Sequence, residues 1–123
     1  MPLLLVMLGG GIGAGLRHLV GRAALAIAGP GWPWGTLTVN LFGGLLMGLL
    51  AGVLARTGGS ENLRLLLGVG MLGGFTTFSA FSLDVANMIE RGALAPAALY
   101  AALSLVGSVA ALFGGLALAR SVA

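Results

Sequence analysis

The polar residues best placed to contact an ion lie in the stretch GGFTTFSAFS, residues 73–82, inside a chain made mostly of Leu, Ala, Val and Gly. Phe78 and Phe81 are three residues apart, a spacing that puts both rings on one face of a helix. Because an aromatic ring has a positive edge, the two rings can face an anion, and the hydroxyls of Ser79 and Ser82 can donate hydrogen bonds to it. Packing of the rings against a neighbouring helix is the alternative that this spacing leaves open.

An amide and a row of hydroxyls occur on two other segments. Asn40, in the stretch GTLTVN, carries two amide donors. Tyr100, Ser104 and Ser108 follow one another at intervals of four residues, so their hydroxyls form a stripe on one helical face. Such donors can replace part of the hydration shell of a small anion, and without a deep fixed cation they do not trap it. The sequence therefore predicts a polar path for a small anion, with interhelical hydrogen bonding as the alternative role of Ser104 and Ser108.

The elements that must position these residues are membrane-spanning helices. Of 123 residues, 59% are hydrophobic and 7% are charged, and the mean hydropathy is +1.10, whereas a typical soluble domain has about 25% charged residues. A bilayer core of about 30 Å needs about 20 helical residues, and four stretches separated by Gly or Pro are long enough: about 2–28, 34–56, 62–90 and 95–120. We predict an all-α membrane protein, with a single four-helix transmembrane domain over residues 1–123.

The stretch 73–82 falls near the middle of the third expected helix. Non-helical backbone at that depth is tolerated only where protein buries it or where it lines a water-filled cavity. Gly73 and Gly74 lower the helix propensity, and the hydroxyls of Thr76 and Thr77 can satisfy backbone groups that an interruption frees. Carbonyls released in this way can coordinate a cation such as Na⁺. We therefore predict that the third helix is broken near its middle.

Charged and reactive residues are too few for several classes of function. The chain has no Cys, which excludes thiol catalysis and Cys-based metal sites. One His and no pair of carboxylates at membrane depth leave no basis for acid–base or metal catalysis, so we expect no enzyme. The net charge of +3 comes from scattered arginines without any lysine, which argues against a nucleic-acid surface. The lipid bilayer is the expected surrounding.

The arginines give no orientation signal. Four spans place the N-terminus, the second connection and the C-terminus on one side of the membrane. The three arginines expected on that side are Arg56, Arg64 and Arg120, and the three expected on the other are Arg17, Arg22 and Arg91. Since orientation normally follows an excess of Lys and Arg on the cytoplasmic side, this balance predicts insertion in both orientations, and it permits an antiparallel homodimer with its axis in the membrane plane. A feature other than arginine count that fixes one orientation is the alternative.

Two further patterns concern packing between helices. Gly44, Gly48 and Gly52 recur every four residues, which allows another helix to approach the second one closely in lipid. Asp84 lies further along the third helix, and an ionisable residue inside a membrane is a functional candidate by default. Arg17 and Arg22 are expected near the same surface, so we expect Asp84 to form an ion pair with one of them.

Three stretches in a fixed order resemble one known family. GGGIGAGLR (9–17), GTLTVNLFGG (35–44) and GGFTTFSAFS (73–82), on the first, second and third expected helices, are similar to the CrcB/Fluc fluoride channels, and the resemblance covers essentially the whole chain. It implies a passive, fluoride-selective channel that exports fluoride from the cytoplasm. It also implies a multi-pass protein of the cell inner membrane that assembles as a dual-topology antiparallel homodimer with two pores.

The resemblance also assigns roles to individual residues. It implies a structural Na⁺ at the centre of the dimer, bound by backbone carbonyls of Gly73 and Thr76, and it places Arg17 at the vestibule of the pore. The implied pore residues are Phe78, Phe81, Asn40, Ser79, Thr77, Tyr100, Ser104 and Ser108. Selectivity for fluoride over chloride rests on the resemblance alone, because the width of a pore cannot be read from a sequence.

Two other functions compete with the channel. A small proton-coupled multidrug transporter also has four helices. Proteins of that class carry a membrane-embedded carboxylate on the first helix, whereas the first acidic residue here is Glu61. Asp84 is the remaining candidate, and it lies on the third helix. A non-transporting assembly subunit is the second alternative, and it leaves the Thr-Thr-Phe-Ser stretch without a purpose.

Overall fold

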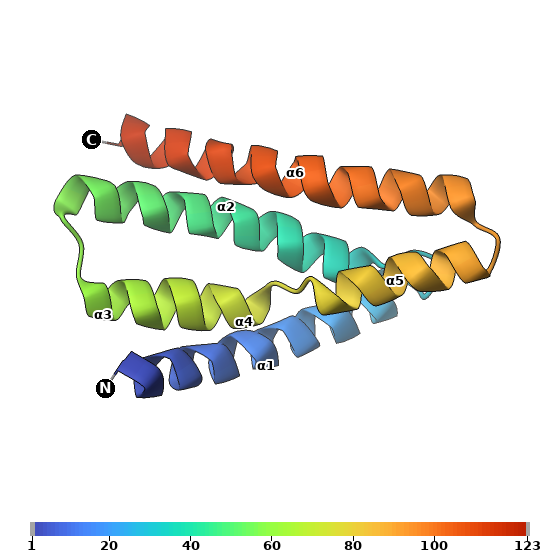
Figure 1. Cartoon of the computed structure of the whole chain (residues 1–123), viewed down its shortest axis with the longest axis horizontal. Helices are drawn as coiled ribbons and strands as arrows, with labels where there is room; N and C mark the ends of the chain where they lie inside the picture. The colour runs from blue at the N-terminus through green and yellow to red at the C-terminus, as the bar shows by residue number, and fades with distance from the viewer. Residues whose placement is uncertain (1, 123) are drawn as a thin grey trace.

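The computed structural model describes residues 2–122, which form an all-α structure with four long apolar segments lying alongside one another (Figure 1). Each is long and apolar enough to cross a membrane, and the four spans are Pro2–Ala28, Trp34–Thr57, Glu61–Glu90 and Leu94–Ser121. Both termini and the connection after α2 lie at one end of the bundle in Figure 1. The prediction of an all-α protein with four long apolar helices is confirmed.

Three of the spans are continuous helices, and the third consists of several elements. The continuous ones are α1 (Pro2–Ala28), α2 (Trp34–Thr57) and α6 (Leu94–Ser121). The third span contains α3 (Glu61–Leu63), the π-helix η1 (Arg64–Leu72), α4 (Gly73–Phe75) and α5 (Ser79–Glu90). Residues 76–78 between α4 and α5, called the junction below, are not helical, and Thr76 has the extended angles φ −85° and ψ 161°. Figure 1 shows the junction as a thin connection between α4 and α5.

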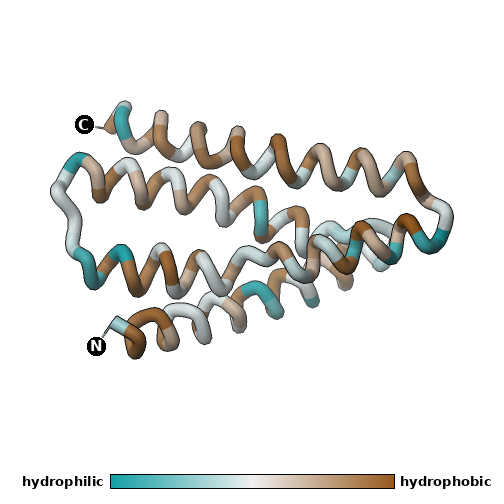
Figure 2. The backbone as a smooth tube through the Cα atoms, viewed as in Figure 1, coloured by the Kyte–Doolittle hydropathy of each residue, from teal (hydrophilic) through white to brown (hydrophobic). Residues whose placement is uncertain are grey.

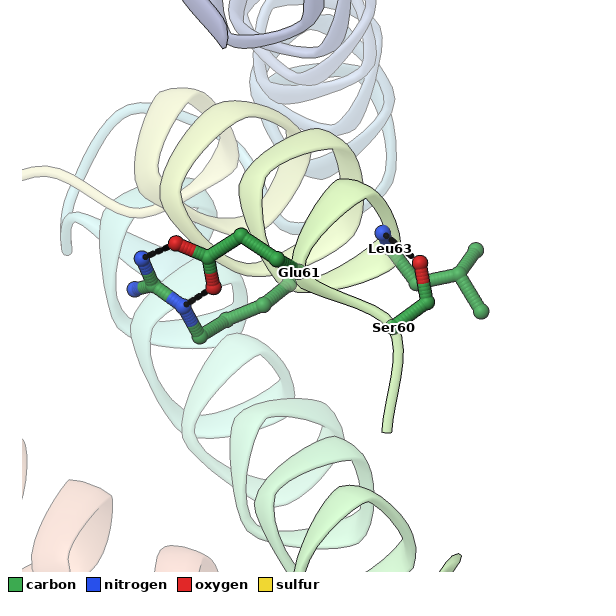
Figure 3. Close-up of polar contacts among 4 residues, drawn as sticks. Ser60, Glu61 and Leu63 are labelled. Carbon is green, nitrogen blue, oxygen red and sulfur yellow. Dashed lines mark hydrogen bonds and ion pairs between the residues drawn. The ribbon is translucent and has the colours of Figure 1, made fainter. Parts of the chain in front are cut away.

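The connection between α2 and the third span is fixed by short-range contacts at the surface. Gly58, which ends α2, has φ +76°, a conformation that glycine adopts without steric cost. Ser60 caps α3, because its hydroxyl accepts a hydrogen bond from the Leu63 N–H at 3.4 Å (Figure 3). Glu61 and Arg64 form an ion pair in which Arg64 Nε lies 2.7 Å from Glu61 Oε1 (Figure 3). Because solvent screens the charges of such an exposed pair, it orders the turn more than it stabilises the fold.

Glycines let α1 lie directly against the backbone of the third span. A Cβ atom added at Gly9 or Gly13 would overlap backbone atoms of η1. One added at Gly74 of α4 would lie 2.5 Å from a carbonyl oxygen of α1. Gly11 and Gly15, on another face of α1, have no such neighbour within 4 Å. The contact therefore uses one glycine face of α1 and allows no larger side chain there.

The glycines that recur every four residues in α2 pack against α6. A Cβ atom at Gly44 would lie 2.7 Å from the carbonyl oxygen of Ser108, and one at Gly52 would lie 2.5 Å from the Cβ atom of Ala119. Gly48 lies between these two and meets the α6 backbone. The close approach that the sequence predicts for α2 is confirmed, and its partner is α6.

Much of the apolar surface is not covered within one chain. Hydrophobic residues run along all four spans (Figure 2), and large side chains such as Ile27, Phe78 and Leu105 are 87%, 78% and 68% exposed. The buried core between α2, α5 and α6 is small, and Tyr100 at its centre is fully buried. Such a distribution suits a protein surrounded by lipid or by a second membrane-spanning chain.

Candidate functional site

A groove of about 500 Å³ between α2, the junction and α6 gathers most of the predicted pore residues. The predicted residues that line it are Asn40, Thr77, Phe78, Phe81, Ser104 and Ser108, and Gly73 and Thr76 line it as well. Ser79 is exposed and lies outside the lining, and so does the buried Tyr100. Residues more than 60 positions apart in the sequence therefore share one groove.

Sequence reasoning missed the apolar part of the lining. Gly43, Gly44 and Met47 follow Asn40 along α2, and Leu105, Val109 and Leu112 accompany the two serines of α6. The signal was available, since residues three or four positions from a lining residue lie on the same helical face. The groove is therefore mostly apolar, with a few polar groups that converge on it.

Asn40 binds both backbone groups of Thr77. Its amide Nδ2 donates to Thr77 O at 2.9 Å, and its Oδ1 accepts from Thr77 N–H at 2.9 Å. In a continuous α-helix Thr77 N–H would instead donate to Gly73 O. A side chain of α2 thus replaces a backbone partner and allows non-helical backbone at this depth. The second N–H of the amide is not used in this pair of hydrogen bonds.

Hydroxyl groups satisfy other backbone groups around the junction. Thr76 Oγ1 donates to Leu72 O at 3.0 Å, and Thr77 Oγ1 accepts from Ala80 N–H at 3.1 Å. Thr77 thus has the role that the sequence predicts for both threonines, whereas Leu72 O already accepts from Thr76 N–H at 3.0 Å. Ser82 Oγ donates to Phe78 O at 2.9 Å, so its proton is directed to the backbone rather than to the groove. The expectation that Ser82 donates to an ion is not met in this geometry.

Two carbonyl oxygens at the junction lose their helical partners as a result. In a continuous helix Gly73 O would accept from Thr77 N–H, and Thr76 O would accept from Ala80 N–H. Both of these N–H groups donate to side-chain oxygens instead. Gly73 and Thr76 both line the groove. Carbonyl oxygens of this kind are suitable ligands for a hard cation.

Four aromatic rings form a continuous row from the groove to the start of α2. The centroids of Phe78 and Phe81 are 5.6 Å apart, and those of Phe81 and Tyr100 are 5.2 Å apart. Trp32 meets Tyr100 edge-on at 5.8 Å with an interplanar angle of 84°. Phe81 is thus held by a buried neighbour, whereas Phe78 is 78% exposed. The ring of Phe78 is therefore open to a ligand or to a second chain.

The three hydroxyls of α6 differ in what they contact. Tyr100 OH donates to Asp84 Oδ2 at 3.0 Å. Ser104 is 5% exposed, and its hydroxyl has no hydrogen-bond partner among residues 2–122. A buried polar group without a partner costs about 1–3 kcal/mol and calls for an explanation. Ser104 is one of the groove residues, and its hydroxyl is buried and unsatisfied, which suits a site that a ligand completes.

The expected ion pair of Asp84 is wrong. Asp84 accepts from Tyr100 of α6, and the ion pair found in the described part of the chain joins Arg64 to Glu61. Arg17 Nε instead donates to Gly74 O at 3.2 Å. Tyr100 of α6 lies within hydrogen-bond distance of Asp84, while Arg17 of α1 contacts the backbone of α4. Arg17 also lines a separate pocket of about 280 Å³, together with Arg22 and Thr77.

Comparison with known proteins agrees with the resemblance seen in the sequence. The family model described as CrcB-like protein, Camphor Resistance (CrcB), matches residues 4–116. A protein of Novosphingobium aromaticivorans is 62% identical over 120 residues, which cover 96% of this chain and 95% of that protein. One of Phenylobacterium zucineum is 61% identical over 122 residues, with 98% and 96% covered, and one of Mesorhizobium japonicum is 57% identical over 120 residues, with 98% and 97% covered. Each of the three is named fluoride-specific ion channel FluC. The similarity over nearly the full length of all these proteins shows that the chain belongs to the CrcB family.

Proposed function

We propose that this protein is a passive, fluoride-selective ion channel and not an enzyme. The observation that carries the proposal is the groove, which combines aromatic rings, the unsatisfied hydroxyl of Ser104 and an unused amide N–H of Asn40. Fluoride is compact and accepts strong hydrogen bonds, so a few neutral donors replace part of its hydration shell. The names of the relatives, which are fluoride-specific ion channels, support the choice of ion.

The ion path follows the groove along α5 and α6. Phe78 and Phe81 present ring edges to the anion, and Asn40 contributes its remaining N–H. Ser104 and Ser108 follow on α6, where Ser104 is the best-placed donor because nothing else in the described chain occupies its hydroxyl. Thr77 contributes through its position at the junction, between the groove and the pocket that contains Arg17.

Tyr100 and Ser79 serve the path differently from the groove residues. Tyr100 packs against Phe81 at 5.2 Å while its hydroxyl is occupied by Asp84, so it fixes the orientation of the phenylalanine ring. Ser79 is exposed next to Phe78, on the side where one chain leaves the groove open. A second chain that covers this side brings Ser79 into the lining.

The channel is an antiparallel homodimer with two pores. The support is the exposed apolar lining, in which Phe78, Leu105 and Val109 are 78%, 68% and 50% exposed, together with the equal arginine counts at the two ends. A second copy that covers this surface closes the groove, and the two-fold axis produces a second, identical pore. In the cell inner membrane, such multi-pass dimers release fluoride from the cytoplasm passively.

A structural Na⁺ lies at the centre of this dimer. Its support is the pair of carbonyl oxygens, on Gly73 and Thr76, whose helical N–H partners bind side chains instead. One chain supplies two such oxygens, and the partner copy supplies two more. Acidic, His and Cys residues form no metal-binding group within residues 2–122, so backbone oxygens are the ligands that the proposal requires. The cation neutralises carbonyl dipoles and holds the two junctions together.

Passive efflux from liposomes tests the proposed function. Purified protein is reconstituted, and fluoride and chloride release are measured with electrodes in the same preparation. We expect rapid fluoride release without chloride release. Absence of fluoride release from demonstrably folded protein contradicts the proposal.

Two phenylalanine variants test the ion path itself. Phe78→Ile and Phe81→Ile keep an apolar side chain of similar size but remove the aromatic edge. We expect a sharp reduction of fluoride efflux in both, with the folded protein retained in size-exclusion chromatography. Full efflux in both variants refutes a path along aromatic edges.

Asp84→Asn separates the channel from a proton-coupled transporter. The amide still accepts the hydrogen bond from Tyr100 but no longer binds a proton. A channel keeps its fluoride efflux after this change. A transporter that exchanges a proton at Asp84 loses its response to a pH gradient.

A further inference from the structure

Arg17 contacts the third span where its first helical part ends. η1 and α4 run without interruption from Arg64 to Phe75, and helical structure stops there. Arg17 Nε donates to Gly74 O at 3.2 Å, across 57 residues of sequence. In a continuous helix Gly74 O would accept from Phe78 N–H. Arg17 therefore supplies a donor to one of the terminal carbonyls that the end of a helix leaves without a partner.

A cation is the donor that such a position favours. The last carbonyls of a helix carry partial negative charge, and a basic side chain that hydrogen-bonds them stabilises the helix end. A charge-assisted hydrogen bond is also stronger than a neutral one. Only Nε of the guanidinium makes this contact, so the other N–H groups of Arg17 remain available to its pocket.

The packing of α1 fixes where Arg17 lies. Gly13, one turn before Arg17, has no room for a Cβ atom because the backbone around Met71 and Phe75 occupies that space. A Cβ atom at Gly74 would lie 2.5 Å from Gly10 O. In Figure 1, α1 runs beside α4 up to the junction. Backbone contact on one turn thus places the guanidinium of the next turn at the end of α4.

We infer that Arg17 is a positioning residue, whose Nε–H holds the end of α4 so that the junction stays non-helical and Phe78 stays at the groove. Asn40 holds Thr77 from α2, and Arg17 holds Gly74 from α1, so the junction is attached to a different helix on each side. The role of Arg17 depends on a donor at the position of Nε, and the positive charge strengthens this hydrogen bond but does not replace the donor. This inference rests on the proposed fluoride conduction only for the flux part of its test.

Two substitutions separate the donor from the charge. Arg17→Gln removes the charge but keeps an N–H donor, because Gln Nε2 is bonded to Cδ as Arg Nε is. Arg17→Lys keeps the charge and places a methylene at that position. Arg22→Gln and Arg22→Lys are matched controls on the same helix and in the same pocket. Fluoride efflux from liposomes is measured for all four variants and the wild type.

We expect Arg17→Gln to keep efflux within about threefold of the wild type and Arg17→Lys to lose about tenfold or more, the factor expected for one charged hydrogen bond. Efflux that survives in Arg17→Lys, or that is lost equally in Arg17→Gln in folded protein, overturns the inference.

Hydrogen exchange gives a second readout that does not depend on transport. Amide exchange in the peptide 73–82 is compared among the same variants. We expect faster exchange in Arg17→Lys than in Arg17→Gln or the wild type, because the junction loses one of its attachments. Equal exchange in all three contradicts the inference. If the wild-type protein releases no fluoride, the proposed function fails, and the exchange comparison still decides the role of Arg17.

Discussion

Removal of the Asn40 side chain amide gives the sharpest test of how the junction is held. Asn40→Leu has nearly the same shape but cannot form the two hydrogen bonds to Thr77, each 2.9 Å long. The N–H and C=O groups of Thr77 then lose their partners in a partly buried position. Each unsatisfied buried group costs about 1–3 kcal/mol, so the free energy of unfolding falls by about 2–6 kcal/mol, with the lower end applying where water reaches the groove.

Asn40→Asp keeps one of the two hydrogen bonds and removes the other. Its carboxylate still accepts from Thr77 N–H, but it no longer donates to Thr77 O, and two oxygens then face each other. We expect a loss of about 1–3 kcal/mol, from one unsatisfied carbonyl. The added negative charge also repels an anion in the groove, so fluoride efflux falls further than stability alone explains.

Thermal unfolding in detergent and liposome efflux measure the two effects. Asn87→Leu is the matched control, because it makes the same substitution at an exposed position of α5. We expect the Tm of Asn40→Leu to lie several degrees below that of Asn87→Leu. Equal Tm values for the two leucine variants, with full efflux in both, refute the claim that Asn40 holds the junction.

Three further predictions concern the groove, the helix contacts and the orientation. Ser104→Ala removes a buried hydroxyl without a partner, so we expect an unchanged or higher Tm together with severalfold lower fluoride efflux. A lower Tm with full fluoride efflux contradicts this prediction. Gly44→Ala places a methyl group 2.7 Å from Ser108 O, so we expect its free energy of unfolding to fall by about 1–3 kcal/mol relative to that of Gly114→Ala, where space is open. Equal Tm values for the two variants contradict this. Two arginines added to the connection 57–60 should favour one orientation in the membrane. Labelling of tagged termini from each side of the membrane measures the orientation. If the wild-type chain already has a single orientation, the equal arginine counts do not support insertion in both directions.

The positions of the helices could be predicted, because the length of the apolar segments and the helix-breaking Gly and Pro residues between them determine where each helix begins and ends. The type of helix could not be predicted in the third span. Residues 64–72 form a π-helix, yet a nearly uniform apolar sequence reads the same whether the N–H groups reach four or five residues back. The stretch packs against the glycine face of α1, and this contact, between residues about 60 positions apart, cannot be read from the local sequence either.

The candidate site could be predicted to the extent that helical spacing places side chains on one face. Spacing grouped Phe78 with Phe81 and Ser104 with Ser108, and all four line the same groove. The partner of Asp84 was predicted wrongly, because the prediction compared only the expected depth of residues in the membrane, and depth does not show that Tyr100 of α6 lies within hydrogen-bond distance. The hydrogen bond from Arg17 to Gly74 O was missed for a related reason: a backbone carbonyl carries no sign in the sequence that it will need a partner.

The π-helical stretch also affects how insertions and deletions act on this protein. Over residues 64–72 each turn contains more residues than an α-helical turn, so the stretch holds extra chain in the same axial length. Loss of one residue there would let the segment relax to α-helical geometry without shortening the span greatly. A residue of an α-helix turns the chain by about 100°, more than a residue of a π-helix does, so the remaining residues would make up for the lost rotation, and Gly73 and Gly74 would stay near the face that α1 contacts. Residues 64–72 are therefore the part of the third span that best absorbs the loss of one residue while the junction and Phe78 keep their direction.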